Sequence, residues 1–586
     1  MYCTPRCIGI GPACRWLCLL LLLATAQERA EPADADRPVV RVVYFIPSDR
    51  QPEPDYRARL DRVMTDVQQF DRLGMQQNNY GNLTFELDRD PQGTLRIYEV
   101  PGQGPMRDYG RNASDKVRRE VKEALAKQGL DIDRETIIIF QLLLQWDGDK
   151  AIEIGPYVGS GGPRSGTAWV YDDVRLDPRS LSSRKPGGYY AGPCSLGQFN
   201  THYIGGVAHE LGHAFGLPHD CERDSDRPRR GRSLMGGGNH TYGQEQRGEG
   251  QGAFLSAASA LPLSVHPLFT GKRKPAAAMT CRLTELKATH EEGKLSLTGR
   301  LQGGPRGVGL VAHNNPQEIP GDYDAVGWTC PVDADGKFAL VIGELKPGDF
   351  DLRLTAFGES GDSRSFTFRY RVDREKRPDL RPFTESVGMQ EMHAAFRSGN
   401  KVRLAEIASE LKKQNRVDDV PSRKAEHLQK LLSLADPRPL DAVALDVSVV
   451  QVADLKWEST TVGWGRPLRN QVLAEGEASC LLEVGGTFFE SGLYAHAPAR
   501  HVLRLDSKWN RFTTNYGLQD GHDGSVVFVV KGDGKELFRS KVVRDHTARE
   551  QSVAVANITL LELIVEDAND GGNSDWGVWL DPQLRR

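Results

Sequence analysis

Hydrophobic residues follow two spacings in the first half of the chain, one typical of strands and one typical of helices. Val39–Ile46 and Thr136–Leu144 are continuous apolar runs, as in buried strands. In Tyr56–Leu73 the apolar residues recur at helical spacing, which predicts an amphipathic helix. A further helix is expected from about His202 to Phe215, and a short strand at Gly166–Tyr171. Strands interleaved with helices predict an α/β domain with one mixed sheet.

The same pattern divides the chain into successive parts. The α/β pattern covers residues 39–270. Short β-like runs separated by Gly, Pro and Asp turns predict a β-sandwich over residues 279–373. Residues 374–440 are charged and helical in pattern, which indicates a helical spacer with a solvated face. β patterning returns over residues 441–586 and predicts a second β-sandwich, so the chain is expected to be multidomain.

The first 26 residues have the pattern of a secretory signal. Arg6 and Arg15 accompany the apolar run 16–23, which is followed by the small-residue sequence Ala-Thr-Ala at 24–26. This run is far shorter than the roughly 20 apolar residues that span a bilayer, which disfavours a membrane anchor. We therefore expect residues 1–26 to be cleaved and the protein to be secreted, either extracellular or in the cell envelope, with no membrane span.

Composition narrows the range of partners. The 586 residues include 75 Lys+Arg and 79 Asp+Glu, a formal net charge of -4. Nucleic-acid binding would need a clustered basic face, so no nucleic-acid partner is expected. The 39% hydrophobic and 26% charged residues are ordinary for a globular protein and exclude a largely disordered or collagen-like chain.

The stretch HELGHAFGLPH combines three histidines and a glutamate at fixed spacing. On a helix, His209 and His213 project from one face one turn apart, so both imidazoles can reach a single ion. Gly216 can adopt the left-handed conformation that ends a helix, and the returning chain brings in His219 as a third ligand. Three protein ligands with one open position are typical of catalytic zinc, and Glu210 is placed to reach the bound water.

Two other interpretations of this stretch remain open. One is an amphipathic helix whose histidines are ordinary polar groups, although chance predicts only on the order of 10⁻⁴ such motifs in this chain. The other is a zinc site kept for structure after catalysis has been lost. Structural sites usually have four closed ligands, whereas Glu210 stands beside the open position here. The spacing therefore favours catalytic zinc.

The extended motif resembles the metzincin clan of zinc metallopeptidases, and Asp220 after it is similar to the adamalysin/reprolysin branch. Met235, sixteen residues after His219, matches the clan's methionine in a tight turn beneath the metal. The resemblance implies a metzincin-like α/β catalytic domain, with a mixed sheet and an active-site helix. It also implies one catalytic Zn²⁺ and hydrolysis of peptide bonds by Glu-assisted attack of zinc-bound water. Gly166–Tyr171 would resemble the edge strand on which an extended peptide is laid.

The chain also departs from the metzincin pattern. Some branches have a tyrosine two residues after the methionine as a switchable ligand, and Gly237 stands at that place. His240 and Tyr242 lie a little further on, and a metal role is not favoured for either. Residues 27–38 contain no cysteine, so an inhibitory propeptide whose cysteine plugs the zinc is not expected.

Five cysteines follow the predicted signal. In an oxidising compartment, Cys194–Cys221 and Cys281–Cys330 are plausible local pairs, which would leave Cys480 single. For the second pair, buried free thiols are an equally good interpretation. For Cys194 and Cys221 a disulfide is favoured, because its loop would clamp the segment that carries the histidines.

Residues 441–586 resemble the bacterial NPCBM family, which implies a galactose-binding-like β-sandwich with carbohydrate as its ligand. The matching stretches are GLYAHA at 492–497, GLQDG at 517–521, VFVVKGDGKEL at 527–537 and EDANDGGNSDWGVWLDP at 566–582. Five of the nine tryptophans fall in this part, and indole rings can stack on sugars or pack in the core. For any single tryptophan, core packing is the favoured interpretation. Trp576 and Trp579 would point to opposite faces of one strand, which would turn one of them outward, so these two are the candidate sugar-binding residues.

A group of oxygen-bearing side chains near the C-terminus raises a second metal. Its members are Asp567, Asn569, Asp570, Asn573 and Asp575. Calcium uses such ligands, but the spacing is not that of an EF-hand loop. A plain polar turn is an equally good interpretation.

These observations predict a secreted zinc metalloendopeptidase that its C-terminal module directs to glycans or glycoproteins. One alternative is a non-catalytic glycan-binding or adhesion protein with a vestigial zinc site. Another is a zinc amidase acting on cell-wall peptides, because the motif does not define which amide is cleaved.

Overall fold

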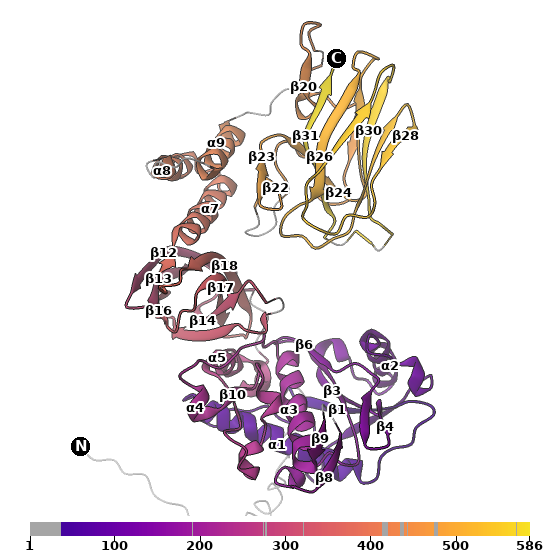
Figure 1. Ribbon diagram of the computed structural model, residues 1–586, viewed down its shortest axis with the longest axis vertical. Coiled ribbons are helices and arrows are strands. Elements are labelled where there is room, and N and C mark those ends of the chain that lie inside the picture. The colour runs from indigo at the N-terminus through magenta and orange to yellow at the C-terminus, as the bar shows by residue number, and fades with distance from the viewer. Residues whose placement is uncertain are drawn as a thin grey trace, which may run out of the picture. The chain divides into compact units, whose positions relative to one another are not determined.

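The computed structural model describes residues 37–189, 192–273, 275, 278–319, 322–412, 420–433, 439–441, 443–473, 479–569, 571–572 and 574–586. The predicted signal at residues 1–26 lies outside these residues. The chain forms two compact units, Met1–Leu380 and Arg381–Arg586, which are described separately (Figure 1). Among the described helices, none has the length and apolar character needed to cross a membrane.

A five-stranded mixed sheet lies within the α/β part of the first unit, in the order β2-β1-β3-β7-β6 (Figure 1). The first four strands run parallel, and β6 pairs antiparallel with β7. The strands are β1 Val40–Ile46, β2 Ile97–Pro101, β3 Thr136–Gln141, β6 Val158–Gly161 and β7 Gly166–Tyr171. The predicted mixed sheet of an α/β domain is confirmed. The apolar runs form β1 and β3 because both strands are buried inside the sheet.

The α/β part also contains helices. They are α1 Tyr56–Gln77, α2 Ser114–Ala126, α3 Leu196–Ala214, α4 Arg227–Arg230, α5 Ala257–Val265 and α6 Pro267–Thr270. The helix expected at Tyr56–Leu73 is confirmed as α1, whose apolar stripe Leu60, Val63 and Val67 is buried. α3 packs on β3, β6 and β7, and α1 contacts α3. The sheet and α1 therefore both support α3.

Smaller elements complete the α/β part. A four-stranded sheet has the order β4-β5-β8-β9, and β10 pairs with β11. These strands are β4 Leu144–Asp147, β5 Lys150–Glu153, β8 Pro186–Tyr189, β9 Pro193–Ser195, β10 Arg232–Ser233 and β11 Ala253–Phe254. The short 3-10 helices are η2 Met106–Asp108, η3 Ile132–Arg134, η4 Pro178–Ser180, η5 Gly238–His240 and η6 Gln244–Arg247.

The rest of the first unit is antiparallel β structure. One sheet has the order β12-β13-β16 and the other β15-β14-β17-β18-β19. Their strands are β12 Arg282–Glu291, β13 Lys294–Gln302, β14 Gly307–Pro316, β15 Val326–Pro331, β16 Lys337–Ile342, β17 Gly348–Gly358, β18 Ser363–Val372 and β19 Pro378–Asp379. We refer to these two sheets, residues 282–379, as the first sandwich. Ala258 and Leu261 of α5 pack on Val311 of β14, so a buried apolar contact joins it to the α/β part.

The second unit begins with three helices, α7 Arg381–Arg397, α8 Lys401–Lys412 and α9 Val420–Ser433. Their apolar faces pack on one another and on a hairpin of β22 Leu482–Val484 and β23 Thr487–Phe489. Leu404 of α8 and Leu428 of α9 are fully buried in a cluster with Leu481. These helices, predicted from the charged stretch 374–440, therefore share a core with the C-terminal part.

The C-terminal part is a β-sandwich. One sheet has the order β20-β31-β26-β29 with β24 also paired to β31, and the other has the order β21-β25-β30-β27-β28. The strands are β20 Val449–Gln451, β21 Ser459–Thr461, β24 Gly492–His496, β25 Ala499–Arg504, β26 Arg511–Leu518, β27 Val527–Gly532, β28 Lys535–Arg539, β29 Arg549–Ala554, β30 Leu560–Glu566 and β31 Trp576–Arg585. The one 3-10 helix described in this part is η8 Val452–Asp454. The predicted β-sandwich is confirmed, and the chain is multidomain and rich in β structure.

Candidate functional site

The long helix α3 carries the histidine motif, and local chemistry fixes both of its ends. Ser195 Oγ accepts a hydrogen bond from Gln198 N, and Gln198 Oε1 accepts one from Ser195 N, a capping box that satisfies two free donors. The helix therefore starts earlier than the expected His202. At the other end Gly216 has φ +87°, and Leu217 N donates to Gly212 O. Gly216 thus stands in the left-handed turn that follows the helix.

The three motif histidines converge. Each of His209, His213 and His219 offers one ligand nitrogen, and the three atoms lie within 4.8 Å of one another. His209 Nε2 and His213 Nε2 are 3.1 Å apart. Two nitrogens bound at about 2.0–2.1 Å to one tetrahedral ion lie roughly 3.3–3.4 Å apart, so this spacing fits a shared zinc ion.

Backbone acceptors orient the first two imidazoles. His209 Nδ1 lies 2.7 Å from Leu234 O, and His213 Nδ1 lies 2.8 Å from Leu217 O. An Nδ1–H that donates to a carbonyl leaves Nε2 as the metal-binding nitrogen. Burial lowers the pKa of His209 to about 4 and also lowers the pKa of His213, so both rings are neutral at neutral pH, as metal ligands must be.

Met235 lies beneath the helix. It is fully buried, and a Cβ placed at Gly212 would come within 2.5 Å of Met235 Sδ. Because Gly212 lies between His209 and His213 in the sequence, the methionine packs directly behind the two histidines. Only a residue without a side chain allows this approach.

Glu210 faces the strand that runs over α3. Its carboxylate accepts a hydrogen bond from the backbone N–H of Gly159 in β6. Burial raises the pKa of Glu210 to about 7, which suits a group that takes up and releases a proton near neutral pH. A Cβ at Gly159 would come within 1.9 Å of Glu210 O, so the strand lies almost on the helix backbone.

The substrate-strand prediction for Gly166–Tyr171 is wrong. That segment is β7, which lies between β3 and β6 and is buried along its whole length. The sheet edge beside α3 is β6, the short sequence VGSG. Because β6 is rich in glycine, it has no hydrophobic pattern by which the sequence would reveal a strand. The same glycines permit its close approach to α3.

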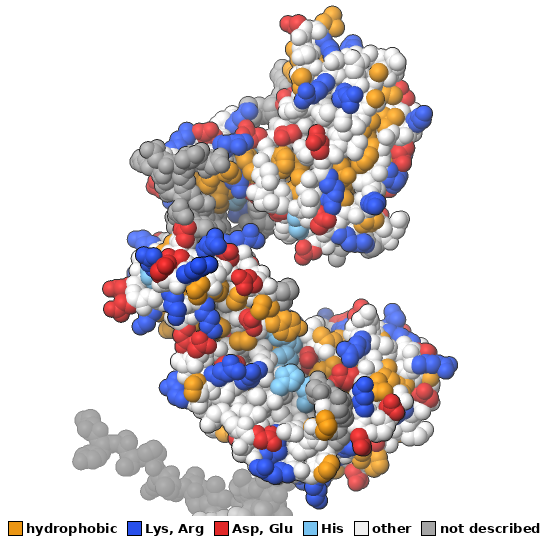
Figure 2. Space-filling model, in the orientation of Figure 1, with side chains coloured by type: hydrophobic (Ala, Val, Ile, Leu, Met, Phe, Trp, Pro, Cys, Tyr) orange, Lys and Arg blue, Asp and Glu red, His pale blue; other side chains and the backbone are white. Residues whose placement is uncertain are grey.

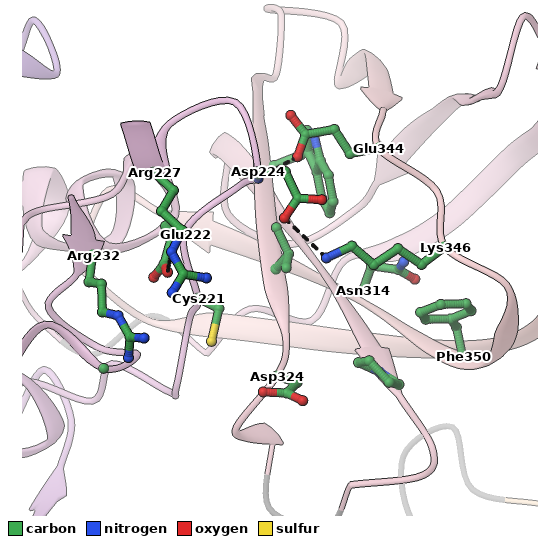
Figure 3. Close-up of a pocket in the computed structure, with 14 residues that line it drawn as sticks. Cys221, Glu222, Asp224, Arg227, Arg232, Asn314, Asp324, Glu344, Lys346 and Phe350 are labelled. Atoms are coloured by element: carbon green, nitrogen blue, oxygen red, sulfur yellow. Dashed lines mark hydrogen bonds and ion pairs between the residues drawn. The ribbon is translucent and has the colours of Figure 1, made fainter. Parts of the chain in front are cut away.

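The first sandwich contributes a residue that the sequence did not reveal. Tyr323 packs on His219, with ring centroids 4.1 Å apart and planes inclined by 30°. Beside this contact is a cavity of about 330 Å³ between the loop after His219 and the sandwich, with Cys221, Trp328 and Phe350 in its walls (Figure 3). Figure 2 shows histidine side chains gathered on the adjoining face of the α/β part.

The polar residues further along the chain do not join the three histidines. Tyr242 is buried and its hydroxyl donates to Asp66 Oδ2 at 2.7 Å. His240 Nδ1 lies 3.2 Å from His202 Nδ1. At Gly237, the place of the switchable tyrosine, the nearest side-chain atom is Arg232 Nη1.

The disulfide predicted between Cys194 and Cys221 is absent. Cys221 is a free thiol whose Sγ donates to Tyr323 O at 3.0 Å. It lies against the first sandwich, whereas Cys194 is in β9 at the other end of α3, near Gln198. Cys330 is also a free thiol, so it forms no disulfide with Cys281. Cys194 and Cys221 are close in sequence, but α3 lies between them and separates them by its length.

The predicted sugar-binding role of Trp576 and Trp579 is wrong for both side chains. Trp579 is fully buried and packs against Phe528, with ring centroids 5.1 Å apart. Trp576 is 7% exposed, and its ring is covered by a parallel stack with His522 at 4.0 Å. Neither indole presents a free face, so core packing explains both.

The oxygen-rich turn is only partly described, since Asp570 and Asn573 lie outside the described residues. Asp575 is fully buried, and its Oδ1 accepts a hydrogen bond from Ser525 N at 2.8 Å. Asp567 Oδ1 accepts a hydrogen bond from Asn569 N at 3.2 Å. These contacts are those of a polar turn, and the calcium prediction stays untested.

Comparison with known proteins supports the C-terminal assignment. Residues 448–585 match the model of the NPCBM/NEW2 domain. The chain carries an NPCBM domain. A Renibacterium salmoninarum protein named "Putative endo-alpha-N-acetylgalactosaminidase" is 30% identical over 174 residues, which are 28% of this chain and 11% of that protein. The chain thus spans about a tenth of the length of this relative.

Two solved structures were also similar. The catalytically inactive OgpA of Akkermansia muciniphila, in complex with an O-glycopeptide (glycodrosocin) substrate, is 23% identical with a TM-score of 0.50. The match covers 59% of this chain and 96% of OgpA, and at this identity it shows a shared fold alone. A CBM51 domain from Clostridium perfringens GH95, in complex with methyl-galactose, is 26% identical with a TM-score of 0.21, covering 23% of this chain and 99% of that domain.

Proposed function

We propose that the chain is a secreted zinc endopeptidase of metzincin type that cleaves glycosylated proteins, with its NPCBM domain binding carbohydrate on the same target. The observation that carries the proposal is the convergence of the three histidine nitrogens with Glu210 beside them. Two further features support the proposal: Met235 is buried behind the histidines, and the glycine-containing edge strand β6 lies over α3. The O-glycopeptide bound to the structurally similar OgpA supports a glycoprotein substrate.

The residues present fit zinc, because three imidazole nitrogens form a donor set that zinc prefers. Zinc held by His209, His213 and His219 would supply a Lewis acid and lower the pKa of water. Glu210 accepts the proton of the attacking water and returns it to the amine that leaves as the peptide bond breaks. Its pKa of about 7 lets the same carboxylate perform both transfers at neutral pH.

The peptide would lie along β6. This strand pairs with β7 on one side and is the last strand of its sheet, so its other side can accept an extended segment by backbone hydrogen bonds. Gly159 lies in β6 and also donates to Glu210, so a peptide there would lie beside the proton-accepting carboxylate.

A cleavage assay with paired substrates tests the proposal. The purified chain is incubated with an O-glycosylated peptide, with the same peptide lacking sugar, and with peptidoglycan, and bound zinc is measured. We expect cleavage of the glycopeptide, and zinc retained in Glu210→Gln without cleavage. Equal cleavage by Glu210→Gln would refute the role of this carboxylate. Release of peptide from peptidoglycan alone would favour an amidase, and zinc binding without any hydrolysis would favour a glycan-binding protein.

A further inference from the structure

The third zinc ligand is held differently from the other two. His209 and His213 lie within the 19-residue helix α3, so their backbone positions are fixed by helical hydrogen bonds. His219 lies beyond the helix end and the Gly216 turn, in a segment without regular secondary structure. Its position must therefore be set by what the segment packs against, since an isolated loop would pay conformational entropy to order a ligand.

The first sandwich provides that packing at the ring itself. Tyr323 belongs to the loop before β15, and its ring lies over the imidazole of His219 at 4.1 Å between centroids. The side chain is 60% exposed, so the histidine covers part of it and the remainder stays open to solvent. The contact restricts rotation of the imidazole, which would otherwise sweep its nitrogen away from the shared ion.

Backbone hydrogen bonds hold the same loop to the chain that follows His219. Cys221 N donates to Ala325 O at 2.7 Å, and Cys221 Sγ donates to Tyr323 O at 3.0 Å. Arg223 donates from Nη2 and Nε to Gly327 O, at 2.8 and 3.1 Å. The chain from 221 to 223 is thus bonded to the loop and to the start of β15.

Two further contacts extend this attachment. Glu344 accepts hydrogen bonds from the backbone N–H groups of Asp224 and Ser225, at 2.6 and 3.2 Å, and Asp224 pairs with Lys346 at 3.2 Å (Figure 3). Gly327 approaches so closely that a Cβ there would lie 2.6 Å from Asp220 Oδ1. The attachment therefore runs from the residue after His219 to Ser225.

We propose that Tyr323 is a positioning residue of the metal centre, and that the first sandwich completes the zinc site by holding His219 in place. This inference rests on the proposed function only in taking the three histidines as zinc ligands. It assigns a role to the first sandwich, whose sequence gave no indication of one. Residues that orient metal ligands typically change metal affinity by about 10–100-fold when removed, which sets the expected scale.

The test measures zinc affinity rather than hydrolysis. Competition with a chelating indicator gives the zinc Kd of the wild-type chain and of Tyr323→Ala, Tyr323→Leu, Tyr323→Phe and Val341→Ala. Val341 is the control because it is half-exposed on β16, which belongs to the other sheet of the same sandwich from β15. We expect Tyr323→Ala to weaken zinc binding about 10-fold, and Tyr323→Phe, which keeps the ring, to stay within about twofold of wild type.

Thermal unfolding of the zinc-free proteins shows whether the variants keep their fold. Should Tyr323→Ala unfold early, Tyr323→Leu retains apolar packing without the aromatic ring and gives the comparison. An unchanged zinc Kd in a folded variant without the ring would overturn the inference, as would equal weakening in Val341→Ala. A wild-type chain that binds zinc but cleaves no peptide would refute the proposed function, while the affinity comparison would still decide the role of Tyr323.

Discussion

The α/β part and the C-terminal sandwich both contain ring side chains that the sequence marks as candidate site residues. These are histidines in the α/β part and tryptophans in the sandwich, and the structure arranges them in opposite ways. In the α/β part, His209, His213 and His219 turn their nitrogens to one point. In the C-terminal sandwich, Trp576 and Trp579 are covered by other rings. A fixed spacing on a helix constrains the direction in which side chains point. A high local count of tryptophan does not, because large apolar rings also commonly pack in the core of a sandwich.

The strongest test of this comparison removes the carboxylate beside the histidines. Glu210→Gln keeps the size of the side chain but cannot take up a proton, so kcat/KM should fall by about 10²–10⁴-fold. Zinc content, measured by metal analysis, should be unchanged because Glu210 is outside the three-nitrogen set. Loss of zinc together with activity would mean that Glu210 supports the metal rather than the proton transfer.

The corresponding test in the C-terminal sandwich concerns stability. Trp579→Ala should lower the free energy of unfolding of the second unit by about 3–5 kcal/mol, because it leaves a large cavity in the core. Trp464 is 51% exposed, so Trp464→Ala is a matched control expected to change stability little. Denaturant unfolding followed by circular dichroism measures both. A stable Trp579→Ala with impaired sugar binding would restore the sugar-binding role.

A third change probes the strand over the helix. Gly159→Ala places a methyl group against Glu210 O, so β6 must shift away from α3. We expect kcat/KM to fall about 10-fold or more with zinc retained, since misplaced substrates lose rate steeply. Gly162→Ala on the same segment meets nothing within 4 Å and should have near wild-type activity. Equal activity of the two variants would mean that β6 does not position the substrate.

The smallest effect is expected on pH dependence, at Asp71 of α1. Burial raises the pKa of this carboxyl to about 8 in the folded chain, against about 3.9 when unfolded. Between these values the folded state keeps a proton that the unfolded state has lost, so stability falls as pH rises towards 8. Asp71→Asn should remove this fall. Relative to wild type, its free energy of unfolding should increase by on the order of 1–3 kcal/mol as the pH rises from 5 to 8. Thermal unfolding at both values checks it, and parallel pH profiles would contradict it.

Much of the fold could be predicted because it depends on local pattern. The buried strands β1 and β3 are continuous apolar runs, and α1 has a helical stripe. The order of strands within a sheet has no such signature. β7 looked like an edge strand and is interior, because the short glycine-rich β6 continues the sheet beyond it. Pairing between distant segments decides that order.

The sequence by itself pointed to His209, Glu210 and His213, since helical geometry converts their spacing into direction. It pointed to Gly216 and His219 through the turn expected after the helix, and to Met235 only through the metzincin resemblance. Tertiary structure alone decided three contacts: the hydrogen bond from Gly159 to Glu210, the hydrogen bond from Cys221 to the first sandwich, and the packing of Tyr323 on His219. These contacts join residues about 50 to 100 positions apart in the sequence. Such distances carry no periodic signal, because they are set by how whole elements pack.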